Sequence, residues 1–422
     1  MVKYHITLII SIIFITILCG CISHDKLTEK DAETASNSAV SMNDGFRPLL
    51  SQIEGTEAWG ISIRQTVDNG YVVCGDAYDG KWSNFIFMLK IDSSGRMIWA
   101  KKFSEGDVLD NGEWKSYDFY TSSLQQNQDG SYTIYAWKGF GGEDGRLLII
   151  NMDKNGNPIE KKVVLDMPDL ISLAATKDGG FILSGVDKTD SYPNYSVLLI
   201  KIDSDSNIEW TKTFKASGDA YGESVMQTSD NGYIIKCSIS NKEYDSKGWL
   251  IKTDSNGNKL WDRIFWSGNH SSLYDVVQTL DQDLLISGGD CQSIHLAKIN
   301  ENGNLIWERT FFEGLVGSFD SIQGTSDDGY IIAGQVSNCP RCSTCQGTSP
   351  DAVVIKIDSR GKKIWQKVFG GIGHNSAEDI MPTSDGGYVI TGATTKNSST
   401  DLLLIKIDSM GNEEWGYYHH PL

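Results

Sequence analysis

The feature that most constrains this chain of 422 residues is a pair of short signatures that return together seven times. The first is a turn rich in Asp and Gly followed by an apolar strand, as in DGGYVI at Asp385. The second is a strand that enters another turn and ends near a large apolar residue, as in IKIDSMGNEEW at Ile405. The repeats are about 50 residues long, a length typical of the blades of a β-propeller.

Each repeat divides into four short predicted strands, which in the last repeat begin at Asp379, Tyr388, Asp401 and Glu413. Tight turns rich in Asp, Asn and Gly join strand one to strand two and strand three to strand four. The composition of 43 Gly, 8 Pro and 12 Trp suits an all-β chain with many turns. The residues expected to close the fourth strands are Trp99, Ile159, Trp210, Trp261, Trp307, Trp365 and Trp415.

The sequence therefore predicts an all-β fold, a seven-bladed β-propeller of four-stranded antiparallel blades. Large rings such as these tryptophans are expected to pack between neighbouring blades. The predicted domains are a signal peptide at 1–20, a flexible tether at 21–45 and the propeller at 46–422. The units are expected at about 51–103, 116–163, 168–214, 222–265, 273–311, 318–369 and 376–418.

The first residues indicate export from the cytoplasm. The apolar run Ile6–Leu18 has 13 residues, whereas a helix that spans a bilayer needs about 20, so the run fits a signal peptide. It ends in Leu18-Cys19-Gly20-Cys21, which resembles the lipobox of prokaryotic lipoproteins. The resemblance implies cleavage after Gly20 and a lipid on Cys21, and hence a lipid-anchored protein at the cell surface. An ordinary signal peptide or a marginal membrane anchor is the alternative, and each also places the domain outside the cytoplasm.

The repeat also resembles known propeller repeats. The IDSxGxxxW unit is similar to the tryptophan-ended repeat of pyrroloquinoline-quinone-type β-propellers and of the outer-membrane assembly lipoprotein with the same fold. It is similar, too, to repeats of the form DGGYIIAG…DVYLIKTDSNGNKLW in surface proteins of archaea and bacteria. The resemblance covers about residues 51–418 and implies a fold but no activity, because propellers host many functions. The turn differs from the sialidase Asp-box by one residue in each spacing, so it implies no sialidase chemistry.

The predicted loops differ between the two ends of each blade. The turns between strands one and two and between strands three and four share one end and are uniform, whereas the other connections vary in length. Insertions gathered on one face favour a binding surface there, and aromatic residues beside acids such as Asp76 and Asp190 suit sugar rings or cationic peptides. The alternative is a solvated acidic rim. The aromatic residues of the predicted ligand-binding face are Trp82, Trp114, Phe140, Tyr192, Tyr195, Tyr244 and Trp266.

The predicted inner strands share a small polar or acidic position, which we expect mainly to let seven strands crowd around the axis. Its residues are Ser62, Ser123, Ser172, Ser224, Asp275, Ser321 and Asp379. The acids near the axis also suit a cation in the channel. They are Glu223, Asp275, Asp320, Glu378 and Asp379. A hydrolase with paired carboxylates would need a defined separation that the sequence does not show.

Four cysteines are expected on neighbouring loops of units five and six. They are Cys291, Cys339, Cys342 and Cys345. Disulfides are the ordinary outcome in an exported protein. A zinc site that includes Cys291 or His295 is the second interpretation, and free thiols are the third. Cys74 and Cys237 fall in predicted second strands and are expected to be buried.

The remaining observations narrow the function. The sequence contains no G-x-S-x-G, Walker or H-E-x-x-H motif. A net charge of −18 argues against a nucleic-acid partner. The sequons at Asn194, Asn269 and Asn397 are candidate glycosylation sites.

We therefore expect a non-enzymatic binding or scaffold module for an extracellular protein or polysaccharide, attached to the membrane through its lipid. No cofactor is expected, apart from zinc or calcium as candidate ions. The alternatives are an extracellular polysaccharide lyase or hydrolase and a quinone- or metal-dependent enzyme on the propeller face.

Overall fold

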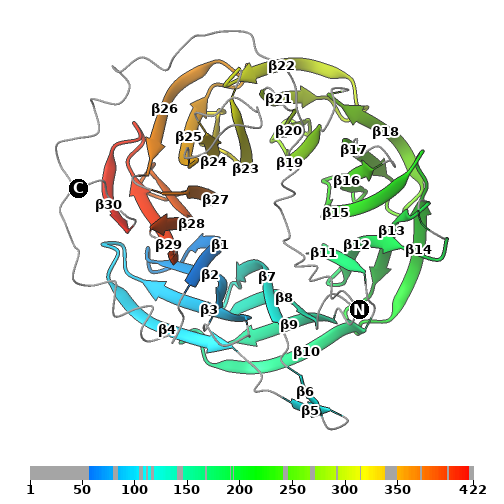
Figure 1. Ribbon diagram of the computed structural model, residues 1–422, viewed down its shortest axis with the longest axis horizontal. Coiled ribbons are helices and arrows are strands. Elements are labelled where there is room, and N and C mark those ends of the chain that lie inside the picture. Colours follow the sequence, from blue (N-terminus) through cyan, green and yellow to red (C-terminus); the bar gives the residue numbers. More distant parts are fainter. Residues whose placement is uncertain are drawn as a thin grey trace, which may run out of the picture.

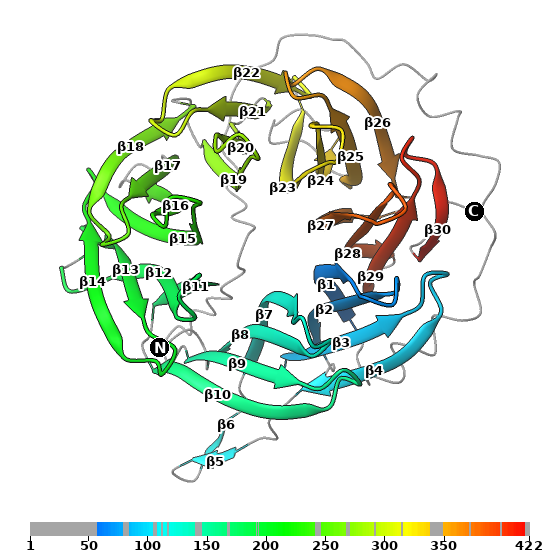
Figure 2. The same ribbon diagram turned by 180° about the vertical axis from the view of Figure 1, so that it is seen from behind.

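The computed structural model is a ring of seven four-stranded antiparallel sheets around a central axis (Figure 1). In every sheet the strands pair in chain order, and the first strand lies nearest the axis while the fourth forms the periphery. Figure 2 shows the same ring from behind. The predicted seven-bladed β-propeller is therefore confirmed.

The structure describes residues 57–78, 84–103, 108–110, 113–115, 118–139, 146–166, 169–190, 192, 194–240, 246–266, 271–290, 293–313, 315–337, 349–370, 373–396 and 399–417. This part of the chain consists of strands, turns and loops, and it contains no helix that could cross a membrane. The predicted signal peptide, Cys21 and the tether lie outside these residues.

Each blade is built from four consecutive strands. Blades one and two comprise β1 (Glu57–Gln65), β2 (Tyr71–Tyr78), β3 (Asn84–Ile91) and β4 (Met97–Phe103), then β7 (Asp118–Gln126), β8 (Tyr132–Gly139), β9 (Arg146–Met152) and β10 (Pro158–Asp166). Blades three and four comprise β11 (Leu170–Ala175), β12 (Phe181–Asp187), β13 (Ser196–Ile202) and β14 (Ile208–Phe214), then β15 (Asp219–Gln227), β16 (Tyr233–Ser240), β17 (Ser246–Thr253) and β18 (Lys259–Phe265).

The other three blades follow in the same order. Blades five and six comprise β19 (Ser272–Gln278), β20 (Leu284–Gly289), β21 (Ile294–Ile299) and β22 (Leu305–Phe311), then β23 (Val316–Gly324), β24 (Tyr330–Ser337), β25 (Asp351–Ile357) and β26 (Lys363–Phe369). Blade seven comprises β27 (Asn375–Pro382), β28 (Tyr388–Lys396), β29 (Ser399–Ile407) and β30 (Glu413–Tyr417). A small separate hairpin, β5 (Val108–Asp110) and β6 (Glu113–Lys115), projects from the periphery where the sequence predicted a loop (Figure 1).

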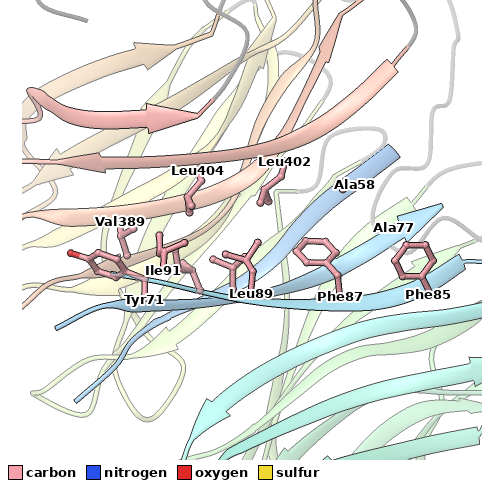
Figure 3. Packing of buried hydrophobic residues seen from close by; sticks show 12 residues of the cluster. Ala58, Tyr71, Ala77, Phe85, Phe87, Leu89, Ile91, Val389, Leu402 and Leu404 are labelled. Atoms are coloured by element: carbon pink, nitrogen blue, oxygen red, sulfur yellow. The ribbon is translucent and has the colours of Figure 1, made fainter. Parts of the chain in front are cut away.

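The apolar pattern of each strand follows its place in the blade. Central strands are covered on both faces, so every residue of β13 is buried. The outer strand β14 is mostly exposed or half-buried, with a buried phenylalanine at its end. The buried side chains form clusters between blades. In the cluster that joins blade one to blade seven, Tyr71, Phe87 and Leu89 face Val389 and Leu404 (Figure 3).

Every inner strand carries a β-bulge at the same position. In β27 the pairing with β28 shifts between Ala377 and Asp379, and equivalent shifts occur in the other six inner strands. A bulge adds one residue, breaks the alternation of side chains and increases the strand twist. The sequence prediction therefore began this strand too late, because β27 starts at Asn375 rather than at Asp379.

An outer ring of contacts joins six pairs of neighbouring blades. In each, a tryptophan of the fourth strand lies against a glycine with a positive φ angle in a turn of the next blade. The pairs are Trp99 with Gly156, Trp210 with Gly257, Trp261 with Gly303, Trp307 with Gly361, Trp365 with Gly411 and Trp415 with Gly95. The indole Nε1 of Trp261 also donates to the carbonyl of Glu301 at 2.8 Å, across the same interface. The expected packing of these tryptophans between blades is confirmed.

A second ring lies beside the axis. Asp379 Oδ2 accepts a hydrogen bond from the backbone N of Ile63 at 3.0 Å, and Asp275 Oδ2 accepts one from Ile322 N at 2.8 Å. Ser172 and Ser321 accept equivalent bonds from the next blade at 3.4 and 3.3 Å. The small polar position therefore does more than make room, because it satisfies backbone N–H groups on the exposed edge of a neighbouring inner strand.

A third ring lies on the face formed by the uniform turns. The side-chain oxygens of four glutamines accept hydrogen bonds from turn N–H groups of the preceding blade. These pairs are Ser384 to Gln65, Val67 to Gln126, Lys177 to Gln227 and Ser229 to Gln278.

Blades seven and one close the ring without exchanging a strand. Each end of the described chain supplies a complete blade, so the closure depends on contacts between side chains and backbone. Arg64 and Asp379 form an ion pair at 2.7 Å near the axis. At the periphery, Trp415 Nε1 donates to Ser93 O at 3.2 Å and the Tyr417 hydroxyl donates to Gly95 O at 2.8 Å.

The joint between blades two and three lacks the tryptophan contact and corrects one expectation. Ile159 was expected at the tryptophan position, but the register places Glu160 there, opposite Asn151, and Ile159 is 69% exposed. The expectation was wrong because aligning the repeats by their apolar ends misplaced this position by one residue. The facing turn of blade three has Ser206 with a φ angle of 70° where other blades have glycine. This joint is held instead by apolar packing, for example of Leu147 with Leu183.

We expect Glu160→Trp combined with Ser206→Gly to increase the free energy of unfolding by about 1–2 kcal/mol. The change would relieve a left-handed backbone at a residue with a side chain and restore the contact present at six other joints. Urea denaturation followed by tryptophan fluorescence and circular dichroism measures the difference.

The matched control is the reverse change at the next joint, Trp210→Glu with Gly257→Ser. We expect it to cost about 3 kcal/mol. A repaired joint that is no more stable than the parent, together with a harmless reverse change, would show that the tryptophan contact does not contribute to the ring.

Candidate functional site

The two faces of the ring differ in construction. On one face every blade presents the same two hydrogen-bonded turns, such as Thr66–Gly70 and Asp92–Arg96 in blade one. Because the strands are antiparallel and paired in chain order, the connections from strand two to strand three and from one blade to the next lie on the opposite face. We call this opposite side the loop face, and it carries the described part of the predicted binding surface.

The structure brings together three tyrosines at the joint between blades three and four. Tyr192 and Tyr195 lie in the loop before β13, and their ring centroids are 6.0 Å apart at an angle of 66°. Tyr221, on the inner strand β15 of blade four, packs edge-on against Tyr195 at 6.4 Å. Tyr192 is 62% exposed, so its ring is open to solvent. We refer to these three residues as the tyrosine cluster.

Backbone contacts hold the tyrosine cluster in place. The N–H of Tyr195 donates to Asp219 Oδ1 at 2.9 Å, and the carbonyl of Tyr195 accepts from Ala220 N at the same distance. Asp219 is itself buried at the start of β15. The loop of blade three is therefore fastened to the first strand of blade four, which keeps Tyr195 in a fixed position relative to Tyr221.

A hollow of about 240 Å³ opens beside the tyrosine cluster. It is lined by Asp190, Asn194, Tyr195, Lys215 and Ala216. Lys215 Nζ and Asp190 Oδ2 are 2.7 Å apart, and this hydrogen bond and the carboxylate charge raise the pKa of Lys215. The hollow therefore combines an aromatic wall with amide, carboxylate and ammonium groups that can each hydrogen-bond to a ligand.

The hydroxyl of Tyr221 stays protonated at neutral pH. Burial, together with the nearby charge of Asp219, raises the pKa of Tyr221 to about 12. Sequence reasoning missed this residue, which falls in the predicted connection one residue before unit four, whereas β15 already begins at Asp219. The signal that could have found it is the position itself, since the first residues of an inner strand emerge directly from the loop face.

Trp266, another predicted ligand-binding residue, is engaged with blade five. Its ring stacks on His295 with a centroid distance of 5.3 Å and an interplanar angle of 16°. Its Nε1 donates to Glu308 Oε1 at 2.5 Å, and its backbone has a φ angle of 50°. Trp266 therefore covers a histidine at the joint between blades four and five rather than presenting both ring faces to a ligand.

Several predicted site residues lie outside the described part of the chain. They are Cys21, Trp82, Phe140, Tyr244, Asn269, Cys291, Cys339, Cys342, Cys345 and Asn397. Trp114 belongs to β6, and its side chain is not described. Asn194 is exposed beside the hollow. Cys74 and Cys237 are buried as expected, and burial raises the pKa of both thiols.

The predicted channel acids lie at or next to the bulges of the inner strands, and protein groups hold several of them. Asp379 accepts from Ser321 Oγ at 3.0 Å as well as from Arg64. Glu223 faces Lys236 at 3.8 Å. Among the residues that the structure describes, no three His, Cys, Asp or Glu side chains converge as metal ligands. Asp379 therefore serves the joint between blades seven and one, and Glu223 pairs within blade four.

Three of the channel acids hold protons more tightly than an exposed carboxyl group does, and one of them is Asp275, whose pKa burial raises. Burial raises the pKa of Asp320, and the charge of Glu378 raises it further. Burial also raises the pKa of Glu378. Ser318 Oγ donates to Asp320 Oδ2 at 2.8 Å. Asp320 and Glu378 occupy the bulges of adjacent inner strands, so their negative charges repel each other.

A set of buried lysines is the main structural feature that the sequence analysis did not identify. In six blades the lysine of the third strand reaches back to the aspartate of the first turn, and in three of them it also contacts the threonine of that turn. In blade four, Lys252 Nζ lies 2.6 Å from Thr228 Oγ1 and 2.8 Å from Asp230 Oδ2. The lysines are Lys90, Lys201, Lys252, Lys298, Lys356 and Lys406. Their recurrence in the IKID segment was visible, but only the folded blade shows what they contact.

Asp76 provides a test of pH dependence. It lies in β2, accepts from the backbone N of Thr121 in blade two at 2.6 Å, and burial raises its pKa to about 7. A carboxyl group with a raised pKa in the folded state stabilises it below the unfolded pKa of about 3.9, and this contribution disappears as the pH rises through 7. We expect the parent to lose about 2 kcal/mol of unfolding free energy from this group between pH 5 and 8.

Asp76→Asn should remove most of that loss, because an amide does not titrate in this range. Its oxygen can still accept the hydrogen bond from Thr121. Denaturation midpoints at pH 5, 6, 7 and 8 measure the slope. Asp178→Asn is the control. Hydrogen bonds, above all the one from Thr176, lower the pKa of Asp178 to about 2. Titration of Asp178 therefore changes the free energy of unfolding only below about pH 4. Equal slopes for the parent and Asp76→Asn would contradict the assignment.

Comparison with known proteins supports the fold. No family model matches the chain, and no curated protein sequence matches it. A solved structure of a protein from Lactobacillus plantarum matches with a TM-score of 0.51 and 13% identity, over 83% of this chain and 97% of that one. A puromycin-hydrolysing peptidase of Mycobacterium tuberculosis matches with a TM-score of 0.52 and 9% identity, over 86% of this chain and 54% of that one.

This chain therefore matches about half the length of the peptidase. At these identities the likeness shows the propeller fold alone. The resemblance of the repeats to pyrroloquinoline-quinone-type propellers stays a prediction.

Proposed function

We propose that this chain is a lipid-anchored, extracytoplasmic binding module that holds a polysaccharide at the tyrosine cluster. The observation that carries the proposal is the exposed ring of Tyr192 beside a hollow with convergent polar groups. Ligand sites of this kind combine an aromatic or apolar wall with a few placed polar side chains. Tyrosine suits this role because its ring offers apolar area and its hydroxyl offers a hydrogen bond.

The charges around the hollow favour a neutral saccharide over a cationic peptide. Lys215 neutralises Asp190, and Lys188 forms an ion pair with Asp169 nearby. Asp219 is committed to the backbone of Tyr195. A cationic peptide would need acids without such partners, whereas a sugar needs an open ring face and a mixture of donors and acceptors.

The contacts of the acids also favour binding over catalysis. Asp190 and Asp219 hold Lys215 and Tyr195, and Asp379 closes the ring, so each has a structural role. A hydrolase would instead need two carboxyl groups facing one substrate across a defined gap. The same binding assay also tests the enzymatic alternatives when product is monitored. These are lyase or hydrolase activity and a quinone- or metal-dependent reaction.

We expect Tyr192→Ala and Tyr195→Ala each to weaken polysaccharide binding about tenfold, because each removes part of the aromatic wall, which corresponds to about 1.4 kcal/mol. A panel of neutral, acidic and amino-sugar polysaccharides is immobilised, and binding of the purified protein is measured by interferometry. Leu280→Ala is the matched control, because Leu280 is exposed but lies in a uniform turn on the opposite face.

Three results would contradict the proposal: no binding to any polysaccharide, equal affinity of the parent and both tyrosine variants, or an equal loss in Leu280→Ala. Binding to an extracellular protein instead, lost in the tyrosine variants, would assign the site to a protein partner. Release of cleavage products from a bound polysaccharide would show that the chain is an enzyme.

The location is tested separately. Cys21→Ser should abolish incorporation of a labelled fatty acid and release the protein from the membrane fraction, because the propeller offers no other proposed anchor. Labelling followed by fractionation of cells that express the parent or the variant measures both. Cys19→Ser is the control and should leave the lipid in place. An unlabelled parent that still cofractionates with membranes would favour an uncleaved membrane anchor.

A further inference from the structure

We infer that His295 Nε2 and Asp290 Oδ2 form a binding site for a divalent transition-metal ion, with Zn²⁺ as the best match. Asp290 directly follows β20, and His295 is the second residue of β21, so both belong to blade five. The ends of these two strands meet at the loop face. The site is separate from the tyrosine cluster, and its test does not depend on polysaccharide binding.

The imidazole of His295 presents a buried nitrogen without a hydrogen-bond partner. Among the described residues, no donor or acceptor satisfies its Nε2. The other nitrogen, Nδ1, lies 3.3 Å from Thr310 Oγ1 on β22. A metal bound at Nε2 requires the ring proton on Nδ1, where Thr310 Oγ1 can accept it, and this leaves the Nε2 lone pair for the ion. Histidines that bind metals are usually oriented in this way, by a hydrogen bond at the second ring nitrogen.

Asp290 places a carboxylate oxygen in front of that lone pair. Oδ2 lies 3.6 Å from Nε2, which is too long for a hydrogen bond. Two ligands of one tetrahedral Zn²⁺, each about 2.0–2.1 Å from the ion, lie about 3.4 Å apart. The carboxylate is held in position because Oδ1 accepts from Ser293 N at 3.0 Å and Asp290 N donates to Ser293 O at 3.1 Å.

The described surroundings cover one face of the imidazole. The stacked ring of Trp266 covers a face of the imidazole, and the indole is fixed by Glu308. The side chain of His295 is 13% exposed and that of Asp290 is 28% exposed, so among the described residues of the site Asp290 is the more accessible ligand. An imidazole nitrogen with a carboxylate suits Zn²⁺, whereas Ca²⁺ prefers oxygen ligands alone.

Zinc titration of the purified full-length chain, followed by calorimetry, tests the site. Accessible thiols are first capped with iodoacetamide, because thiols also bind zinc and the loop cysteines lie outside the described residues. We expect one Zn²⁺ per chain. His295→Gln and Asp290→Asn should each lower the affinity at least tenfold, and Thr310→Val, which removes the contact at Nδ1, should lower it about tenfold.

His374→Gln is the matched control. His374 is a partly buried histidine of blade seven whose Nε2 is within 2.8 Å of Gln335 Oε1, and its replacement should leave zinc affinity unchanged. Thermal unfolding adds a readout that does not depend on calorimetry: zinc should raise the melting temperature of the parent but not that of His295→Gln.

Three outcomes would overturn the inference. The first is no zinc uptake by the capped parent, although the uncapped parent binds, which would assign the metal to thiols. The second is equal zinc affinity in the parent and His295→Gln. The third is no zinc binding under any condition, which would leave His295 and Asp290 as a structural pair only. If His295→Gln fails to fold, Asp290→Asn and Thr310→Val supply the comparison with the capped parent.

Discussion

The contact of each outer tryptophan with a glycine of the next blade is the constraint on which the ring depends most. A Cβ atom at Gly156 would come within 2.6 Å of the Trp99 ring, so only a residue without a side chain allows the indole to lie this close to the turn. The same glycine adopts a φ angle of 74°, which L-residues with a side chain rarely adopt. One small residue therefore satisfies both the turn and the interface, and the repeat must keep the two positions together.

Rigid joints and rigid blades explain why the loop face can vary. Inside a blade, a buried lysine such as Lys252 ties the third strand to the first turn, and the turn aspartate compensates its charge. Between blades, the tryptophan, glutamine and inner-strand contacts act at different radii. Because these contacts lie along the turn face and the strands, a change in the loops at the other end need not disturb them. The tyrosine cluster uses this arrangement, since its rings come from two blades whose relative position is already determined.

The sequence predicted the fold because the repeat length, the turn residues and the recurring tryptophans are local signals that each blade shows independently. It was less successful where a property depends on two blades at once. Tyr221 was missed because its role arises only where β15 meets the loop before β13. The stacking of Trp266 on His295 joins residues of different blades, and no spacing in the chain announces it. The late start of β27 and the misplaced Ile159 have a simpler cause, since a bulge or a one-residue offset defeats alignment by apolar pattern.

The joint between blades two and three shows that the contacts of the ring occur in sets. Where Glu160 replaces the tryptophan, the facing glycine is replaced by Ser206, and the usual lysine opposite that position is replaced by Asn151. Without the indole, the interface does not require a glycine, and Ser206 is tolerated there although its φ angle is positive. Both proposed sites lie instead at joints that keep the tryptophan contact, between blades three and four and between blades four and five, where loops from two blades can hold a fixed geometry.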